Sequence, residues 1–221
     1  MMITIHNEVK KAIPNFKLGY IEYENTTIST TPQMFKGRFR LFQESIYFDL
    51  LDQELKSVHG IAEWRKIFKQ TGTDPSRYRP SAEALYRRIK KGQFLEPVNS
   101  GVDINNFFSL KYSIPFGLYD NAKLNGQLSV MIGKENDHYT GLNGRIISLD
   151  KILHTADENG PFGSPYIDST RSPISEATTD AIQLVYLLPS IENNEAVKML
   201  ESVASMFVQI NGGNFKVNLV S

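Results

Sequence analysis

Four polar side chains fall within eight residues of one another, at Asn99, Asp103, Asn105 and Asn106. Such side chains compete with backbone hydrogen bonding inside a helix and favour caps, turns and ligand contacts. Their amide and carboxylate groups are suited to hold an amino group, a ribose hydroxyl or a water molecule. We take Asn99, Asp103 and Asn106 as the frame of a binding pocket. The alternative is structural, because Asn99 or the serine after it would cap a helix that begins near residue 102 and Asp103 would accept from backbone N–H groups.

A second group of candidate residues lies in the polar segment 159–180, NGPFGSPYIDSTRSPISEATTD. We predict Asp168 and Ser169 as catalytic residues that orient a water molecule or an amino group. Arg171 is predicted to bind substrate, since a guanidinium and hydroxyl donors together hold a carboxylate or a phosphate. The alternative is a structural loop built from Asx and Ser/Thr turns. Loops of this length in compact domains are often functional.

The third candidate is a basic segment from Arg77 to Lys91, which carries six Lys or Arg residues against a single acid, Glu83. Arginines on a turn and a following helix are able to contact phosphates, and interleaved tyrosines are able to stack on exposed bases. The alternative is a solvated helix face whose arginines pair with acids. The predicted nucleic-acid-binding residues are Arg77, Arg79, Arg87 and Arg88.

Several classes of function lose support from composition. The 221 residues contain 24 basic and 24 acidic side chains and no cysteine, which excludes disulfides and thiolate chemistry and does not favour a DNA-binding protein. None of the four histidines has a metal-ligand spacing, and no phosphate-binding glycine motif or serine-hydrolase motif is present. We therefore expect no metal and no cofactor. The absence of an apolar run typical of a signal peptide or a membrane helix predicts a soluble, cytoplasmic protein.

The elements that must position these residues alternate irregularly between helix and strand. Apolar residues from Phe35 to Leu55 recur at helical spacing, which predicts a long helix between Pro32 and Gly60. Other helices are predicted at 61–68, at 81–92 capped by Ser81, at 102–112, and from a cap at Ser190 to Gly212. Strands are predicted at 16–23, 127–132, 144–149, 181–188 and 215–220. This order favours an α+β fold.

The segment from Pro97 to Gly126, PVNSGVDINNFFSLKYSIPFGLYDNAKLNG, resembles the tRNA-editing domain in the β subunit of bacterial phenylalanyl-tRNA synthetase. The resemblance continues in GLNGRIISLD and in ADENGP at 156–161, and it covers roughly residues 77–190. The whole chain is more similar to free-standing relatives of that domain, which share the Arg-Tyr-Arg-Pro-Ser segment that begins at Arg77. No catalytic core or anticodon-binding part of a synthetase is visible.

The resemblance implies a layered, β-sandwich-like sheet core flanked by helices, within one domain spanning residues 1–221. In that domain, residues 1–76 pack on a family core at 77–190, and residues 191–221 add a helix and a strand. It further implies a protein that hydrolyses, in trans, the ester of a mischarged amino acid on tRNA. The family's pocket histidine falls at Gly117, which we include among the substrate-binding residues. This glycine either enlarges the pocket or marks a domain that binds tRNA without cleaving. A pocket for a free amino acid or similar metabolite is the remaining alternative.

Overall fold

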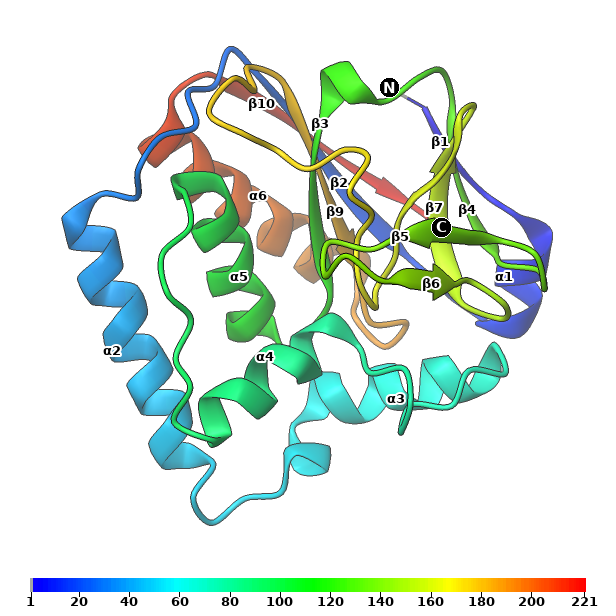
Figure 1. Ribbon diagram of the computed structural model, residues 1–221, viewed down its shortest axis with the longest axis horizontal. Coiled ribbons are helices and arrows are strands. Elements are labelled where there is room, and N and C mark those ends of the chain that lie inside the picture. The colour runs from blue at the N-terminus through cyan, green and yellow to red at the C-terminus, as the bar shows by residue number, and fades with distance from the viewer. Residues whose placement is uncertain (1) are drawn as a thin grey trace.

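The computed structural model describes residues 2–221, which form two four-stranded sheets packed with helices (Figure 1). The helices are α1 (Asn7–Ala12), α2 (Gln33–Asp49), α3 (His59–Gln70), α4 (Ser81–Lys90), α5 (Ser100–Tyr112) and α6 (Asn193–Asn211), with short 3₁₀ turns at Leu55–Ser57 and Asn121–Lys123. The strands are β1 (Ile3–Ile5), β2 (Leu18–Glu24), β3 (Phe116–Asp120), β4 (Leu128–Ile132), β5 (His138–Thr140), β6 (Ile146–Ser148), β7 (Leu153–Asp157), β8 (Gly160–Gly163), β9 (Ala181–Tyr186) and β10 (Asn214–Val220). The expected α+β class is confirmed.

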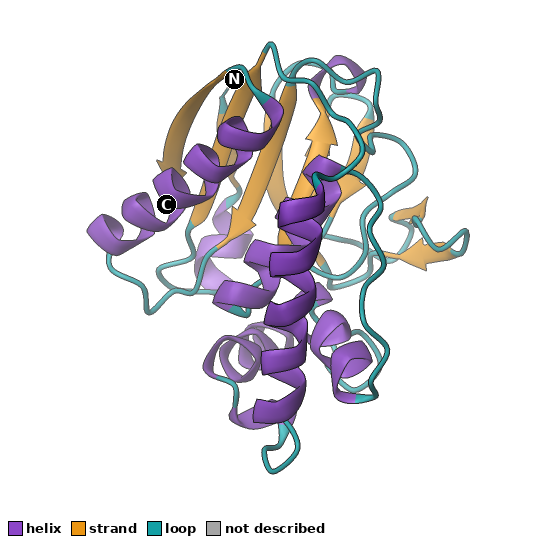
Figure 2. Ribbon diagram, turned by 90° about the vertical axis from the view of Figure 1, so that its left-hand side faces the viewer, coloured by secondary structure: helices purple, strands orange, loops and turns teal. Residues whose placement is uncertain are grey.

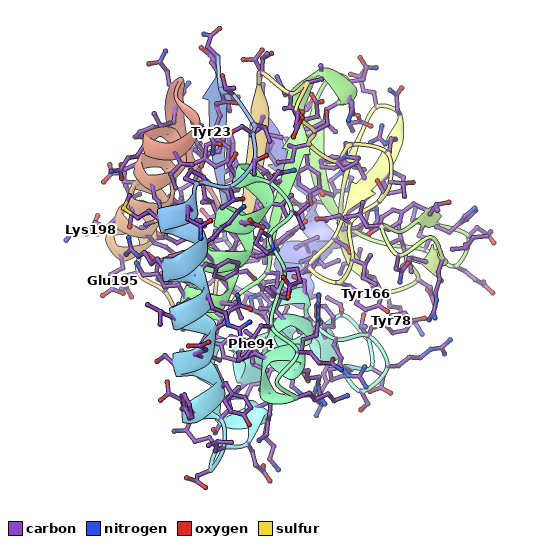
Figure 3. The ribbon with its side chains drawn as sticks, turned by 60° about the vertical axis from the view of Figure 1, so that its left-hand side comes forward. Tyr23, Tyr78, Phe94, Tyr166, Glu195 and Lys198 are labelled. Atoms are coloured by element: carbon purple, nitrogen blue, oxygen red, sulfur yellow. The ribbon has the colours of Figure 1, made fainter. Side chains whose placement is uncertain are left out.

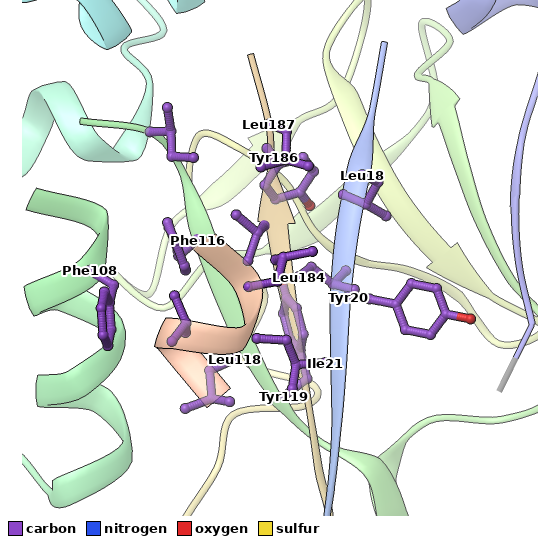
Figure 4. Close-up of a cluster of buried hydrophobic side chains, with 14 of the residues drawn as sticks. Leu18, Tyr20, Ile21, Phe108, Phe116, Leu118, Tyr119, Leu184, Tyr186 and Leu187 are labelled. Carbon is purple, nitrogen blue, oxygen red and sulfur yellow. The ribbon is translucent and has the colours of Figure 1, made fainter. Parts of the chain in front are cut away.

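The two sheets have the strand orders β1-β4-β7-β8 and β10-β2-β9-β3, and β5 pairs with β6 as a separate hairpin. Strand β9 lies inside the second sheet, antiparallel to both β2 and β3, and all six of its residues are buried. This explains its largely apolar sequence, because a strand covered on both faces has no solvent side. The one amide in the strand, Gln183, is buried and hydrogen-bonded on both sides, to Tyr23 and Asn105. Figure 4 shows the resulting cluster, in which Phe108 of α5 faces the β3 side chains Phe116 and Leu118.

The helices lie in layers against the second sheet. In Figure 1, α5 and α6 cover its left-hand face and α2 lies outside α5. Helix α5 contacts both β3 and α6, which fixes its polar first turns next to the sheet. No helix within residues 2–221 combines the length and the apolar character needed to cross a lipid bilayer.

Three predicted helix boundaries are wrong. Helix α2 ends at Asp49 rather than near Gly60, and Gly60 lies inside α3. The glycine is required there by packing, since a Cβ at this position would lie 2.4 Å from the carbonyl oxygen of Ser113. Ser81 is the first residue of α4 and not its cap. The N-cap of the last helix is Glu192, two residues after the predicted cap at Ser190. The Ser190 hydroxyl instead donates to Glu63.

Candidate functional site

A cavity of about 240 Å³ lies where α4, α5, β3 and the loop after β8 meet. Most of its wall is apolar, and the polar side chains come from two sides: Asn105, Asn106 and Ser109 from α5, and Asp168 and Ser169 from the loop. The lining residues are Ser81, Leu85, Val102, Asn105, Asn106, Ser109, Phe116, Leu118, Tyr119, Leu142, Ile167, Asp168, Ser169, Pro173 and Ile174. Among these residues Asp168 is the only charged one. A mostly apolar cavity with a few convergent polar groups is the usual form of a small-ligand site.

Asp168 is held by two hydrogen bonds to the same carboxylate oxygen. The Tyr119 hydroxyl donates to Oδ1 over 2.7 Å, and the backbone N–H of Ser164 donates over 3.2 Å. Burial raises the pKa of Asp168 to about 6, and these two hydrogen bonds only partly oppose the rise. The other oxygen, Oδ2, receives no hydrogen bond from any residue in the range 2–221. The carboxylate therefore offers an unpaired acceptor that is ionised at neutral pH.

Tyr119 reaches Asp168 only because two glycines leave room for its ring. A Cβ at Gly117 would lie 2.0 Å from the Tyr119 hydroxyl oxygen, and a Cβ at Gly163 would lie 2.1 Å from it. The ring also packs edge-on against Phe162, with centroids 4.8 Å apart. The Tyr119 hydroxyl fills the space that a side chain at Gly117 would take, and Gly117 itself does not line the cavity.

On the opposite wall of the cavity, a buried chain of hydrogen bonds fixes the orientation of the Asn105 side chain. The Tyr23 hydroxyl donates to Gln183 Oε1 over 2.8 Å, and the Gln183 amide donates to Asn105 Oδ1 over 2.9 Å. Gln183 is completely buried, so this chain fixes which end of the Asn105 amide is available to a ligand. The neighbouring Asn106 side chain lines the cavity with no hydrogen bond to another described residue.

Two of the predicted pocket residues hold the start of α5 instead. Asn99 Oδ1 accepts from the backbone N–H of Val102 over 2.9 Å and caps the helix. Asp103 is buried and accepts from the backbone N–H of Val98 over 3.0 Å and from the hydroxyl of Thr31. Burial raises the pKa of Asp103. Neither residue lines the cavity, so the capping alternative describes both.

Arg171 lies on the same loop as Asp168 but outside the cavity. Its guanidinium donates to both carboxylate oxygens of Asp157, over 3.1 and 2.8 Å, and to the carbonyl of Gly160 over 3.0 Å. A bidentate pair of this kind is geometrically specific and holds the loop to the β7–β8 turn. Ser169 remains at the cavity wall, where its hydroxyl accepts from the backbone N–H of Arg171.

The basic residues divide into two groups. Arg87 is paired with the buried Glu83 at 2.8 Å, as is Arg65 at 3.0 Å, which matches the alternative of arginines paired with an acid. Arg77, Arg79 and Arg88 are exposed, and no ion pair holds any of them among residues 2–221.

The turn that carries Arg77 and Arg79 is tied to the loop that carries Asp168. The rings of Tyr78 and Tyr166 pack edge-to-face with centroids 5.3 Å apart, and the backbone N–H of Ser81 donates to the carbonyl of Pro165 over 2.8 Å. Figure 3 shows the two tyrosines side by side at the surface. The exposed arginines of this turn therefore lie next to the cavity that holds Asp168.

Sequence reasoning missed three residues of this site. Tyr119 and Asn105 both lie in the segment from Pro97 to Gly126, but their orientation depends on partners far along the chain, at Asp168 and Gln183. Leu142 follows β5, is 56% exposed and donates its backbone N–H to the carbonyl of Asp168 over 2.9 Å.

Within residues 2–221, no group of three or more His, Asp or Glu side chains is arranged to hold a metal ion.

Replacing Asp168 with Asn is expected to stabilise the protein at neutral pH. The folded-state pKa of about 6 lies above the ordinary value of 3.8, so the folded state binds more protons than the unfolded state between these values. The wild-type free energy of unfolding therefore falls as pH rises through this window. Asp168→Asn should exceed the wild type by up to about 3 kcal/mol above pH 6, with the gap closing near pH 4, as measured by urea unfolding at several pH values.

Asp157→Asn is the matched control and should have the opposite sign. Burial alone would raise the pKa of Asp157, but hydrogen bonds from Arg171 and from the backbone of Asn125 and Asn159 lower it on balance. Its contribution to stability is therefore present at neutral pH and is lost as pH falls through its folded-state pKa. If Asp168→Asn destabilises the protein at pH 7.5 as Asp157→Asn does, the burial account of Asp168 is wrong.

Comparison with known proteins identifies the family to which the chain is similar. A family model described as the B3/4 domain matches residues 63–211. The chain is 34% identical over 218 residues to the uncharacterized protein YhzB of Bacillus subtilis (strain 168), and the match covers 99% of each chain. It is 32% identical over 98 residues to the phenylalanine–tRNA ligase beta subunit of Paramagnetospirillum magneticum, covering 43% of this chain and 12% of that subunit.

Among solved structures, the N-terminal fragment of the phenylalanyl-tRNA synthetase β subunit from Pyrococcus horikoshii aligns with a TM-score of 0.49 and 10% identity, covering 97% of this chain and 50% of that one. The ligase subunits are much longer than the segment that this chain matches. The family match extends from α3 to the end of α6 and includes every residue that lines the cavity, and on this ground the chain belongs to the B3/4 domain family.

Proposed function

We propose that the protein hydrolyses the ester of an amino acid attached to tRNA, with the aminoacyl group bound in the cavity beside Asp168. The observation that carries this proposal is the charge of the cavity: it holds one carboxylate, and none of its lining residues is Lys, Arg or His. An aminoacyl ester presents an α-ammonium group and no free carboxylate. A free amino acid presents both, and its carboxylate would enter this cavity without a cationic partner.

In this proposal the free oxygen of Asp168 accepts hydrogen bonds from the α-ammonium group of the substrate. A charge-assisted bond in a desolvated site is strong and orients the group. Asn106, whose amide has no partner among residues 2–221, donates to the ester carbonyl, and the Ser169 hydroxyl positions the attacking water. Water adds to the carbonyl carbon, the bond to the ribose oxygen breaks, and that oxygen takes a proton.

The position of the exposed arginines supports tRNA as the carrier of the ester. Arg77 and Arg79 lie on the turn that packs against the Asp168 loop through the rings of Tyr78 and Tyr166. Positive charge outside the cavity is suited to a phosphate backbone, while the negative charge inside is suited to the ammonium group. Relatives named as phenylalanine–tRNA ligase subunits are consistent with this assignment.

Deacylation of a panel of correctly and incorrectly charged tRNAs tests the proposal. We expect the wild type to release the amino acid from at least one mischarged species, and Asp168→Asn to lower kcat/KM by at least about 100-fold, because a neutral amide does not pair with the ammonium group. Affinity for uncharged tRNA should be unchanged in that variant. Binding without hydrolysis of any species would indicate a non-catalytic tRNA-binding module. If the protein neither binds nor hydrolyses any of these tRNAs, the remaining alternative is a pocket for a free amino acid or similar metabolite.

Replacing Arg79 with Gln should weaken tRNA binding without changing the cavity. Each lost phosphate contact is expected to reduce the slope of log K against log salt by about 1. Lys198→Gln is the control, since Lys198 is exposed on α6, away from Tyr78 and Tyr166 (Figure 3). Filter binding at several salt concentrations measures both slopes. Equal slopes for Arg79→Gln and the wild type would remove Arg79 from the interface.

A further inference from the structure

Helix α2 carries two apolar faces, of which the fold uses only one. Phe35, Phe39 and Ile46 are buried against the rest of the protein. On the other side, Met34, Leu41 and Phe48 are 88%, 67% and 65% exposed. Figure 2, viewed from the side on which α2 lies, shows no other described element in front of this helix. Large apolar side chains gathered on one exposed face are typical of an interaction surface.

The spacing of the exposed residues is regular. Met34, Leu41 and Phe48 are seven residues apart, so they drift by only about 20° per step around the helix and form one stripe. Small residues flank the centre of this stripe, at Gly37 and Ser45, and a Cβ at Gly37 would meet nothing within 4 Å. Small residues beside an apolar stripe allow a second helix to approach closely.

The stripe is complementary to itself when reversed. Leu41 is its midpoint, so an antiparallel copy of α2 places Leu41 against Leu41 and Met34 against Phe48. Thioether–aromatic contacts of the second kind are favourable. A two-fold axis through Leu41 produces this arrangement, and an isologous interface of this type closes after two copies.

The charges along α2 favour the same arrangement. Its first half carries Lys36, Arg38 and Arg40, whereas Glu44 and Asp49 lie in its second half. Arg40 and Glu44 form an exposed ion pair at 2.8 Å along one edge of the stripe. They lie on either side of residue 42, close to the two-fold axis, so an antiparallel copy brings the Arg40 of one chain beside the Glu44 of the other. A parallel copy would place like charges together.

We propose that the occupant of this surface is a second copy of the same chain, which pairs through α2 into an antiparallel, two-fold symmetric dimer. A helix of 17 residues is about 25 Å long, so the surface area that two such helices bury is at the low end for protein–protein interfaces. We therefore expect the dimer to dissociate on dilution. No residue of α2 lines the cavity beside Asp168, so pairing leaves the wall of that cavity unchanged.

Sedimentation equilibrium over a wide concentration range tests the proposal. The wild type should pass from the 25.0 kDa monomer to a dimer as concentration rises. Leu41→Glu places two carboxylates together on the axis and should weaken dimerisation by at least about 100-fold. Ile146→Glu is the matched control, because Ile146 is 76% exposed on the β5–β6 hairpin and should not affect the dimer.

Cross-linking supplies an independent measurement. The chain contains no cysteine, so Leu41→Cys introduces the only thiol and should give a disulfide-linked dimer on mild oxidation, whereas Ile146→Cys should not. A wild type that stays monomeric at its highest soluble concentration overturns the proposal. So does a dimer that Leu41→Glu leaves intact, because the contact would then lie elsewhere. Association only with a different protein would assign the surface to that partner and also overturn it.

Discussion

The hydrogen bond from Tyr119 to Asp168 is the interaction on which the candidate site depends. It places a carboxylate in a largely apolar cavity, where burial raises its pKa to about 6. Its Oδ2 atom has no hydrogen-bond partner within the described range 2–221. The bond itself depends on Gly117 and Gly163, since a side chain at either position would meet the Tyr119 hydroxyl. Two segments distant in sequence, 117–119 and 163–168, thus fix one acceptor. The arrangement costs stability at neutral pH, which is common for groups retained for binding or chemistry.

The charge inside the cavity is negative, and the charge on the turn beside it is positive. Asp168 supplies the negative charge inside, while Arg77 and Arg79 lie exposed on the turn that Tyr78 and Tyr166 fasten to the same loop. Two other candidate arginines pair with acids of the fold: Arg171 binds Asp157 at the β7–β8 turn, and Arg87 pairs with the buried Glu83. The net charge of zero is therefore compatible with a local site for a polyanion that carries a cationic group.

The sequence predicted the α+β class and many of the elements, because apolar periodicity reports directly which face of a helix or strand is buried. Asn99 and Asp103 were predicted as part of the pocket frame, but the structure matches the local alternative, in which Asn99 caps α5 and Asp103 accepts from a backbone N–H group. Prediction from the sequence failed where partners are distant. The orientation of Asn105 depends on Gln183, 78 residues away, and the pairing of Arg171 with Asp157 depends on the β7–β8 turn. The predicted serine caps were also wrong, because Ser81 is the first residue of α4 and donates its backbone N–H to Pro165, and the Ser190 hydroxyl donates to Glu63 instead of capping α6.

The most direct test of the account is the affinity of the protein for matched ligands that differ only at the amino-acid carboxylate. Calorimetry with a non-hydrolysable 3′-aminoacylamino analogue of adenosine, and with the corresponding free amino acid, compares the two for a panel of side chains. The account predicts that at least one analogue binds while its free amino acid does not, because the cavity offers an acceptor for the ammonium group and no cation for a carboxylate. A free amino acid that binds as tightly as its analogue would contradict the account.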